Sequence, residues 1–387
     1  MPDSASNFSL GIVAIGRNEG ERFERCILSL KREAQSLTIV YVDSGSTDNS
    51  VAFAKSHGVH VVNLDMSRPF TAARARNAGL DKLLEVSPHT EFVQFIDGDC
   101  EVIEGWLAAG SAALQQNPQV VAVSGRLRER FPEKSLYNRL ADLEWDRPLG
   151  ETKSCGGVAM MRIEAVRRVG GFDAGLIAGE EPELCARMRA HGGKILNIAD
   201  DMAWHDMAMT NSSQWFKRAR RHGHAIIEVS YFKTAASRGL FKQQLKSALF
   251  WAGIVVFGLV MAVVLFSPVI TVPLAVMTDM ADYSRHGELT QGAEGAVSIS
   301  LAAYSRLVLW SAKWILGGIF LVSAMWYLQM LRIAWKARKS QGLATWDAIW
   351  YGRLIMVSKE YQVRGMIDFL WRRWRKREAT IISFKEG

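Results

Sequence analysis

Two carboxylates that follow an apolar segment are the residues of this chain best suited to chemistry. The segment 92–96 leads directly into Asp97, Gly98 and Asp99. At positions i and i+2, both carboxylates can turn toward one divalent ion and toward a diphosphate that the ion neutralises. Gly98 lets the backbone bend and approach a ligand closely. Because surface turns often contain Asp-x-Asp, the value of this signal depends on the elements around it.

Those elements alternate between strand and helix. Short apolar runs predict strands at 10–15, 38–42, 59–64, 92–96 and 120–123, and helical patterns predict helices at 23–30, 48–56, 72–86 and 106–114. This alternation predicts an α/β fold, a Rossmann-like domain whose mainly parallel sheet carries helices on both faces. Ligands of such sheets gather at the carboxyl ends of the strands. Polar clusters occur at four of these ends, at 17–19, 43–48, 65 and 97–99.

The order of these motifs resembles family 2 of the glycosyltransferases, which have the GT-A fold, over roughly residues 9–225. The matching segments are 12–19, 42–48, 74–79 and 97–99. The first one departs from the family pattern, which has Pro and Tyr where this chain has Gly16 and Arg17. The resemblance implies an inverting transfer from a nucleoside-diphosphate sugar, with Mg²⁺ or Mn²⁺ as cofactor.

The resemblance also implies roles for residues that would bind the nucleotide. Asp43 would accept from the base, which suits uracil without excluding guanine, and Asn18 and Glu19 would flank the base and the ribose. Ser and Thr in 44–48 could equally cap a helix. Arg76 would face the site from its helix, although a solvated basic face is the alternative. Asp97 would contact the ribose or a metal-bound water.

The metal ligands implied by the resemblance are Asp99 and His205. Imidazole is a suitable borderline ligand for such an ion, although a single histidine is more often structural. Gly156 and Gly157 lie in a turn of small residues that would let an acceptor sugar approach the backbone, so we expect them to bind the acceptor.

The catalytic carboxylates are expected at 180–181. This pair resembles the family's Glu-Asp pair at the start of a helix, and the second acid of that pair is the general base. Here the second acid is Glu181, and Glu180 beside it would contact the acceptor. An inverting transfer needs one carboxylate to deprotonate the acceptor hydroxyl. The alternative is that both acids complement the dipole of the helix that they begin.

Two long apolar segments predict a transmembrane hairpin. No charged residue occurs in 248–276, and a second segment, 310–331, is similarly apolar apart from Lys313. Both approach or exceed the roughly 20 residues that span hydrocarbon. Pro268 and Pro273 are expected to kink the end of the first. Lys and Arg flank the outer ends of the pair, whereas the connecting segment carries Asp279, Asp282, Glu288 and Glu294, so both ends of the chain are predicted to be cytoplasmic.

The remaining sequence predicts a basic cytoplasmic tail. Apolar residues recur at helical spacing from Trp346 to Tyr361, and Trp371 and Trp374 alternate with arginines. This pattern is typical of an amphipathic helix on the inner leaflet, and a helix packed on the soluble domain is the alternative. The formal net charge of +8 is concentrated near apolar segments, which favours a membrane surface over nucleic acid. The polar N-terminus predicts no secretory signal, and four cysteines without paired spacing suit a reducing cytoplasm.

Three domains are therefore expected: a GT-A domain at 1–235, a transmembrane hairpin at 236–335 and a basic tail at 336–387. The predicted function is a multi-pass enzyme of the cell inner membrane that transfers a sugar to a lipid-linked or polysaccharide acceptor in envelope or exopolysaccharide assembly. A polyprenyl-phosphate glycosyltransferase and a catalytically degenerate nucleotide-sugar-binding subunit are the alternatives. A processive synthase is disfavoured, because only two spans are predicted.

Overall fold

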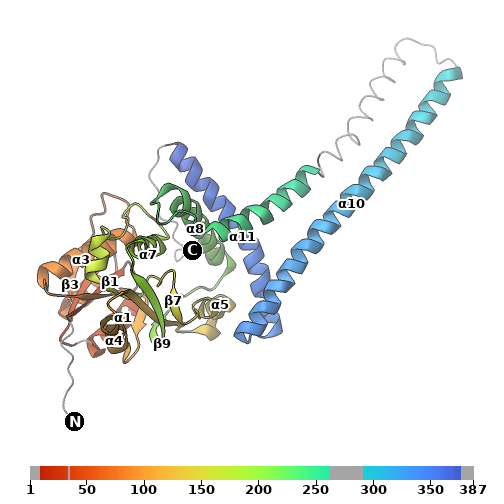
Figure 1. Cartoon of the computed structure of the whole chain (residues 1–387). Helices are drawn as coiled ribbons and strands as arrows, with labels where there is room; N and C mark the ends of the chain where they lie inside the picture. The colour runs from red at the N-terminus through yellow and green to blue at the C-terminus, as the bar shows by residue number, and fades with distance from the viewer. Residues whose placement is uncertain (1–8, 34, 262, 264–290, 376–387) are drawn as a thin grey trace. The chain divides into compact units, whose positions relative to one another are not determined.

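The computed structural model describes residues 9–33, 35–261, 263 and 291–375 (Figure 1). These residues belong to two compact units. The first unit contains residues up to Leu245 together with those from Tyr361 onward, and the second unit contains Lys246–Glu360.

The first unit is built on a nine-stranded sheet. Its strands are β1 (Leu10–Gly16), β2 (Thr38–Asp43), β3 (His60–Asn63), β4 (Phe92–Asp97), β5 (Cys100–Val102), β6 (Val120–Glu129), β7 (Gly150–Thr152), β8 (Ala159–Arg162) and β9 (Lys194–His205). Their order is β3-β2-β1-β4-β8-β6-β9-β5, and β7 pairs with β9. The five strands predicted before residue 126 are all present.

The sheet is mixed, and the prediction of a mainly parallel sheet is wrong for its second half. β1, β2, β3 and β4 pair in parallel. From β8 onward, β4–β8, β6–β8, β5–β9 and β7–β9 are antiparallel, and β6–β9 is parallel. The sequence signal for β5 and β7 is weak because each has only three residues. Antiparallel β8 enters between β4 and β6, where a βαβ succession predicts a parallel neighbour.

Helices cover both faces of the sheet, as the alternating pattern predicts. They are α1 (Glu21–Glu33), α2 (Ser50–Ser56), α3 (Ala72–Val86), α4 (Trp106–Gln116), α5 (Leu136–Glu144), α6 (Ile163–Arg168), α7 (Glu180–Ala190) and α8 (Ser212–Phe232), with a short 3₁₀ helix at Pro132–Lys134. Ile12 and Ala14 of β1 pack in one apolar core with α1, α2 and α4. Val13 and Ile15 pack in the other with α3 and α7. The alternation of side chains along a strand thus explains the two cores.

One glycine brings α3 unusually close to the sheet. A Cβ at Gly79 would collide with Val13 of β1, so only glycine fits where α3 crosses the strand. Thr71 caps the helix, since its Oγ1 accepts the Arg74 N–H at 3.1 Å. This close packing holds the first two turns of α3, which carry Arg76, at the carboxyl end of the sheet.

The C-terminal part of α11 (Thr345–Trp374) packs on α8 within the first unit. A Cβ at Gly223 would collide with the backbone of Gln362, and the rings of Phe216 and Tyr361 stack with centroids 4.4 Å apart. For Tyr361–Trp374, the structure thus shows the packing that the alternative predicts, a helix packed on the soluble domain.

The second unit contains two helices that are long and apolar enough to cross a membrane, by length and composition alone. They are Lys242–Met261 and the part Val308–Gln341 of α10 (Gln291–Gln341), and 11% of each apolar window is buried. The first helix begins before the predicted 248, and α10 is continuous through both predicted boundaries of the second span, 310 and 331. Residues 264–276 of the first predicted span, with Pro268 and Pro273, lie outside the described residues. So do Asp279, Asp282 and Glu288 of the predicted connection, whereas Glu294 lies within α10.

Candidate functional site

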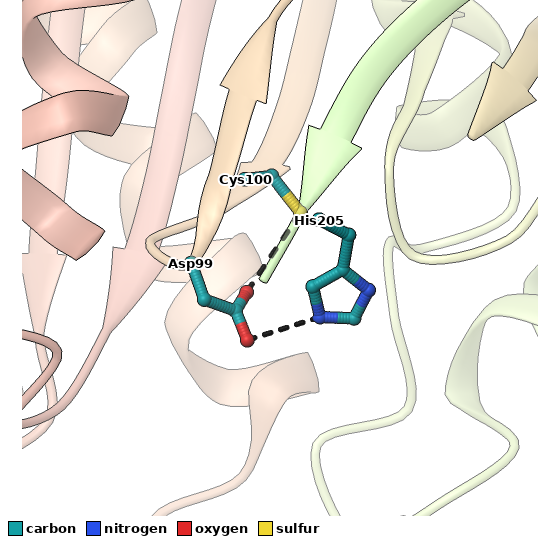
Figure 2. Close-up of side chains that lie close together, drawn as sticks. All are labelled: Asp99, Cys100 and His205. Carbon is teal, nitrogen blue, oxygen red and sulfur yellow. Dashed lines mark hydrogen bonds and ion pairs between the residues drawn. The ribbon is translucent and has the colours of Figure 1, made fainter. Parts of the chain in front are cut away.

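The pairing of β5 with β9 brings the predicted metal ligands together. Cys100 lies opposite His205 in this antiparallel pair, and Asp99 directly precedes β5. Asp99 Oδ2 lies 3.0 Å from His205 Nε2, and the Cys100 thiol donates to Asp99 Oδ1 at 3.7 Å (Figure 2). The side chains of Asp99 and His205 are 3% and 16% exposed. The two predicted ligands therefore converge, and Cys100 joins them without having been predicted.

The donor set of this cluster fits a divalent ion. Adjacent ligands of an octahedral Mg²⁺ at 2.0–2.1 Å are about 2.9 Å apart, close to the separation of Asp99 Oδ2 and His205 Nε2. Carboxylate and imidazole suit Mg²⁺, Mn²⁺ and related borderline ions. The Trp145 ring stacks on the imidazole, with centroids 4.7 Å apart and planes tilted by 24°, which fixes the orientation of the imidazole. These residues therefore meet the chemical requirements of the predicted metal site.

Beside this cluster, a buried arginine joins two of the predicted site carboxylates. Arg76 Nη2 donates to Asp97 Oδ1 at 2.9 Å, and its Nη1 donates to Glu180 Oε1 at 2.8 Å. The Arg76 side chain is 3% exposed, so the alternative of a solvated basic face does not hold. Burial lowers the pKa of Arg76, but the two carboxylates outweigh it and raise that pKa overall. Segments 104 residues apart in sequence, α3 and α7, thus meet at this side chain.

The two loops at the carboxyl ends of β1 and β2 are linked by hydrogen bonds. Asn18, at φ +53°, accepts the Thr47 N–H at 2.7 Å with its Oδ1 and donates its own N–H to Ser46 Oγ at 3.0 Å. Asp43 is buried, and its carboxylate accepts the N–H groups of Gly45 and Ser46, both at 2.9 Å. Both predicted nucleotide-binding residues therefore shape one double loop.

The alternative role of 44–48 as a helix cap is wrong, because the N-cap residue of α2 is Asn49 and its side chain makes no capping hydrogen bond. Asp48 Oδ1 accepts the Ser50 N–H at 3.0 Å, and Asp48 Oδ2 accepts the Gly20 N–H at 2.9 Å. Burial raises the pKa of Asp48, but these bonds lower it below its ordinary value. Asp48 therefore stabilises the turn before α2 and ties the two loops together.

Glu19 lies near the metal motif and forms an ion pair with a residue of α1, the helix that follows it. Its Oε2 lies 2.8 Å from Arg22 Nη2. Its Cγ lies 3.5 Å from the positions that a Cβ would occupy at Gly16 and at Gly98. The Glu19 side chain therefore lies next to the end of β1 at Gly16 and next to the turn after β4 at Gly98.

The predicted acceptor glycines lie in the loop before β8. A Cβ at Gly157 would lie 2.8 Å from Arg76 Nη2 and 3.3 Å from Asp97 Oδ2, so a side chain there would disturb the Arg76–Asp97 pair. Gly156 has φ +89°, a conformation that favours glycine. The backbone at Gly157 thus reaches the centre of the site.

Glu181 is buried beneath the same loop, in an environment that its sequence does not predict. Its Oε1 accepts the Cys155 N–H at 2.6 Å, the Cys155 thiol at 3.2 Å and the Cys185 thiol at 2.9 Å. The residue is 4% exposed. All three bonds go to one oxygen, and within the described part of the chain no hydrogen bond to Oε2 is found.

Several residues at the site were not predicted from the sequence. Arg147 donates to the carbonyl of Ser154 at 2.7 Å and so supports the glycine loop. Arg221 of α8 is partly buried, and desolvation lowers its pKa overall, although the nearby Glu180 and Asp97 act to raise it. The basic run 217–221 in the sequence is the only signal that could have indicated Arg221. Trp145 and Arg147 follow α5 in a stretch with no motif.

The structure groups the sequence-predicted residues into three adjoining clusters and the double loop. These are Asp99 with His205; Asp97, Arg76 and Glu180 with Gly157; and Glu181 with Cys155. The clusters adjoin because Asp97 and Asp99, and likewise Glu180 and Glu181, are neighbours in sequence. The arrangement can hold a divalent ion, and it can bind anionic groups near the buried Arg76 and the partly buried Arg221. It also offers the Glu181 carboxylate, whose Oε1 accepts the Cys155 N–H.

Comparison with known proteins agrees with this geometry. Residues 12–167 match Glycosyl transferase family 2, and residues 99–281 match Glycosyl transferase family group 2. The pre-mycofactocin glycosyltransferase of Mycobacterium tuberculosis is 26% identical over 236 residues, which cover 57% of this chain and 47% of that protein. Succinoglycan biosynthesis protein ExoA of Rhizobium meliloti is 27% identical over 206 residues, covering 50% of this chain and 62% of that protein.

Solved structures also resemble the chain. Mannosyltransferase PcManGT from Pyrobaculum calidifontis, solved with GDP-Man and Mn²⁺, has a TM-score of 0.49 at 18% identity, covering 84% of this chain and 88% of that chain. S. aureus TarS 1–349 has a TM-score of 0.41 at 14% identity, covering 56% and 65%. The family matches and the named relatives together support a family 2 glycosyltransferase.

Proposed function

We propose that this protein is a metal-dependent, inverting glycosyltransferase that takes a sugar from a nucleoside-diphosphate donor, with uridine as the expected nucleoside. The observation that carries the proposal is the convergence of Asp99 and His205 with the Arg76-linked carboxylates at the carboxyl edge of one sheet. The matched segments cover only part of the length of the relatives. The activity of the whole protein is therefore proposed from the geometry of the site.

The donor is proposed to bind along the carboxyl edge of β1, β2 and β4. The double loop of Asn18 and Asp43 would accommodate the nucleoside. Asp97 would contact the ribose, and Glu19 lies at the same strand ends. Asp99 and His205 would hold the divalent ion, which when bound neutralises charge on the diphosphate. The buried Arg76 and the partly buried Arg221 add positive charge beside the same carboxylates.

The acceptor hydroxyl is proposed to lose its proton to Glu181. Its Oε1 is fixed by the Cys155 N–H, which leaves Oε2 as the atom to receive the proton. Glu180 is bound to Arg76, which suits a positioning role between donor and acceptor better than proton transfer. The loop at Gly156 and Gly157 would form the acceptor side of the pocket, since only small residues fit beside Arg76.

The acceptor is proposed to be lipid-linked or an envelope polysaccharide, at the cytoplasmic face of the inner membrane. Support comes from the two apolar helices, on which Phe257 and Phe320 are 65% and 75% exposed. Large exposed apolar surfaces of this kind mark sites that contact a membrane or another protein. One relative is named for succinoglycan biosynthesis, a polysaccharide pathway.

The experiment that tests the proposal is a transfer assay with the full chain in detergent. Donors are UDP-, GDP- and dTDP-sugars, each with Mg²⁺ or Mn²⁺, and NMR reads the anomeric configuration of the product. The proposal expects one preferred donor, dependence on the ion, and inverted configuration. Retained configuration, or equal turnover in excess chelator, would contradict it.

A further inference from the structure

The group formed by Cys155, Cys185 and Glu181 has a second property, independent of the proposed reaction. The two sulfur atoms lie 3.5 Å apart, and they lie 3.2 and 2.9 Å from Glu181 Oε1. All three residues are buried, with exposed fractions of 3%, 0% and 4%. Their three candidate ligand atoms, one from each residue, all lie within 4.8 Å of one another.

These three distances are close to those around a small tetrahedral ion. With Zn–S of about 2.3 Å and Zn–O of about 2.0 Å, a tetrahedral site places two sulfurs about 3.8 Å apart and sulfur and oxygen about 3.5 Å apart. To hold such an ion, the observed triangle needs to expand by about 0.3 Å on two edges and by about 0.6 Å on the edge from Cys185 to Glu181. The Cys155 N–H already orients Glu181 Oε1, as an outer hydrogen bond does for a metal ligand.

Exchange of protons for a metal ion leaves the charge of this buried group unchanged. Both thiols donate a hydrogen bond to Glu181 Oε1, so both carry protons when no ion is bound. A divalent ion would displace two protons to the buffer and form two metal–thiolate bonds. The net charge of the group is therefore that of the Glu181 carboxylate alone in either state, which avoids the large penalty of adding charge to a protein interior.

We propose that Cys155, Cys185 and Glu181 form a second metal site, which takes a thiophilic divalent ion such as Zn²⁺ or Cd²⁺ and not Mg²⁺. Two thiolates favour soft and borderline ions, whereas Mg²⁺ prefers oxygen ligands. Binding at Glu181 Oε1 would draw electron density from the whole carboxylate and make Oε2 a weaker base. If Glu181 is the general base, as the proposed function has it, such an ion inhibits transfer.

The test is a Cd²⁺ titration of the full chain in detergent with excess Mg²⁺, followed by ultraviolet thiolate-to-Cd²⁺ charge-transfer absorption. Wild-type protein should develop a saturable band that Zn²⁺ removes. Cys155→Ser and Cys185→Ser should each lose most of the band. Cys26→Ala removes another buried thiol and should keep it, as the matched control. Glu181→Gln should weaken Cd²⁺ binding by roughly tenfold or more, because one of the three ligands loses its charge.

Thermal unfolding of each variant shows that it is folded before it is titrated. A band of undiminished intensity in the double variant Cys155→Ser, Cys185→Ser, or a wild-type protein without a band, overturns the site. A weak residual band is assigned to Cys100 by its loss on Cys100→Ser. Inhibition of transfer by Zn²⁺ is measured separately. A wild-type band without any inhibition supports the metal site and counts against Glu181 as the base, so failure of the two proposals can be distinguished.

Discussion

Asp99 Oδ2 and His205 Nε2 lie 3.0 Å apart, although 106 residues separate them in sequence. The contact exists because β5, directly after Asp99, pairs with the end of β9. The Asp206 N–H extends this pairing by donating to the Asp99 carbonyl at 3.0 Å. Both candidate ligands are thus fixed by backbone pairing, so a divalent ion would find them already positioned.

His205→Ala should weaken Mn²⁺-supported donor binding more than Mg²⁺-supported binding. Imidazole contributes more to a borderline ion than to a hard one, and we expect a loss of about tenfold or more for Mn²⁺. Titration of each ion at fixed donor concentration, read by calorimetry, measures this. Equal effects on the two ions, or no effect, would mean that His205 is structural and positions only Asp99.

Glu181→Gln should leave donor binding near normal and lower turnover by about 10²–10⁴-fold, the usual contribution of a general base. Gln keeps an oxygen that can accept the Cys155 N–H, so the loop should remain in place. Glu180→Gln is the matched comparison and should change donor affinity as well, because it removes the negative charge that pairs with Arg76. The opposite pattern, with turnover lost only in Glu180→Gln, would make Glu180 the base.

Arg76→Lys should destabilise the fold and weaken donor binding, although it keeps the charge. One ammonium cannot reproduce the two bonds to Asp97 and Glu180. Loss of a buried pairing usually costs 3–5 kcal/mol, and the 36% exposure of Asp97 reduces this, so we expect about 2 kcal/mol. Urea unfolding measures the change. Arg32→Lys, at an exposed position in the last turn of α1, is the control and should be nearly neutral. An equal loss there would contradict the account.

Glu129 should make the fold less stable as the pH rises. It is buried, which raises its pKa from 4.5 to about 7, even though the N–H groups of Phe131 and Met207 lower it. Between pH 4.5 and about pH 7, the Glu129 carboxyl is ionised in the unfolded chain but still protonated in the folded chain. The stabilisation is therefore complete below about pH 4.5 and is lost by about pH 7.

The comparison for this prediction is Glu129→Gln, which does not titrate. Unfolding free energies of both proteins are measured from pH 4.5 to pH 8. As the pH rises, the unfolding free energy of the wild type should fall by about 3 kcal/mol relative to that of Glu129→Gln. A difference that stays constant, or that shifts the other way, would mean that the carboxylate is ionised in the folded protein.

The first four strands and the helices between them could be predicted because their apolar periodicity is strong. β5 and β7 could not, since three residues give no periodicity. The mixed order of the second half escaped prediction because pairing between β4 and β8 depends on tertiary packing. The tail was ambiguous because the aromatic residues near Tyr361 suit both a lipid surface and the face of α8.

Sequence motifs identified the site residues better than their surroundings. Asp99, His205 and Arg76 converge as the motifs predict. The thiols around Glu181 could not be predicted, since Cys155 and Cys185 are 30 residues apart and have no metal-type spacing. Trp145 likewise contacts His205 only because α5 packs beside β6, a long-range contact that no local pattern reports.

The most direct test of the central claim is binding of a fluorescent nucleotide-sugar panel to wild-type protein and to Asp99→Ala, with and without Mn²⁺ or Mg²⁺. The account predicts that wild-type protein binds one donor class tightly only with the ion, and that Asp99→Ala binds it weakly whether or not the ion is present. Cys26→Ala, prepared in parallel, should bind like the wild type. Ion-independent binding by the wild type, or ion-dependent binding retained in Asp99→Ala, would contradict the claim that this edge of the sheet is a metal-assisted donor site.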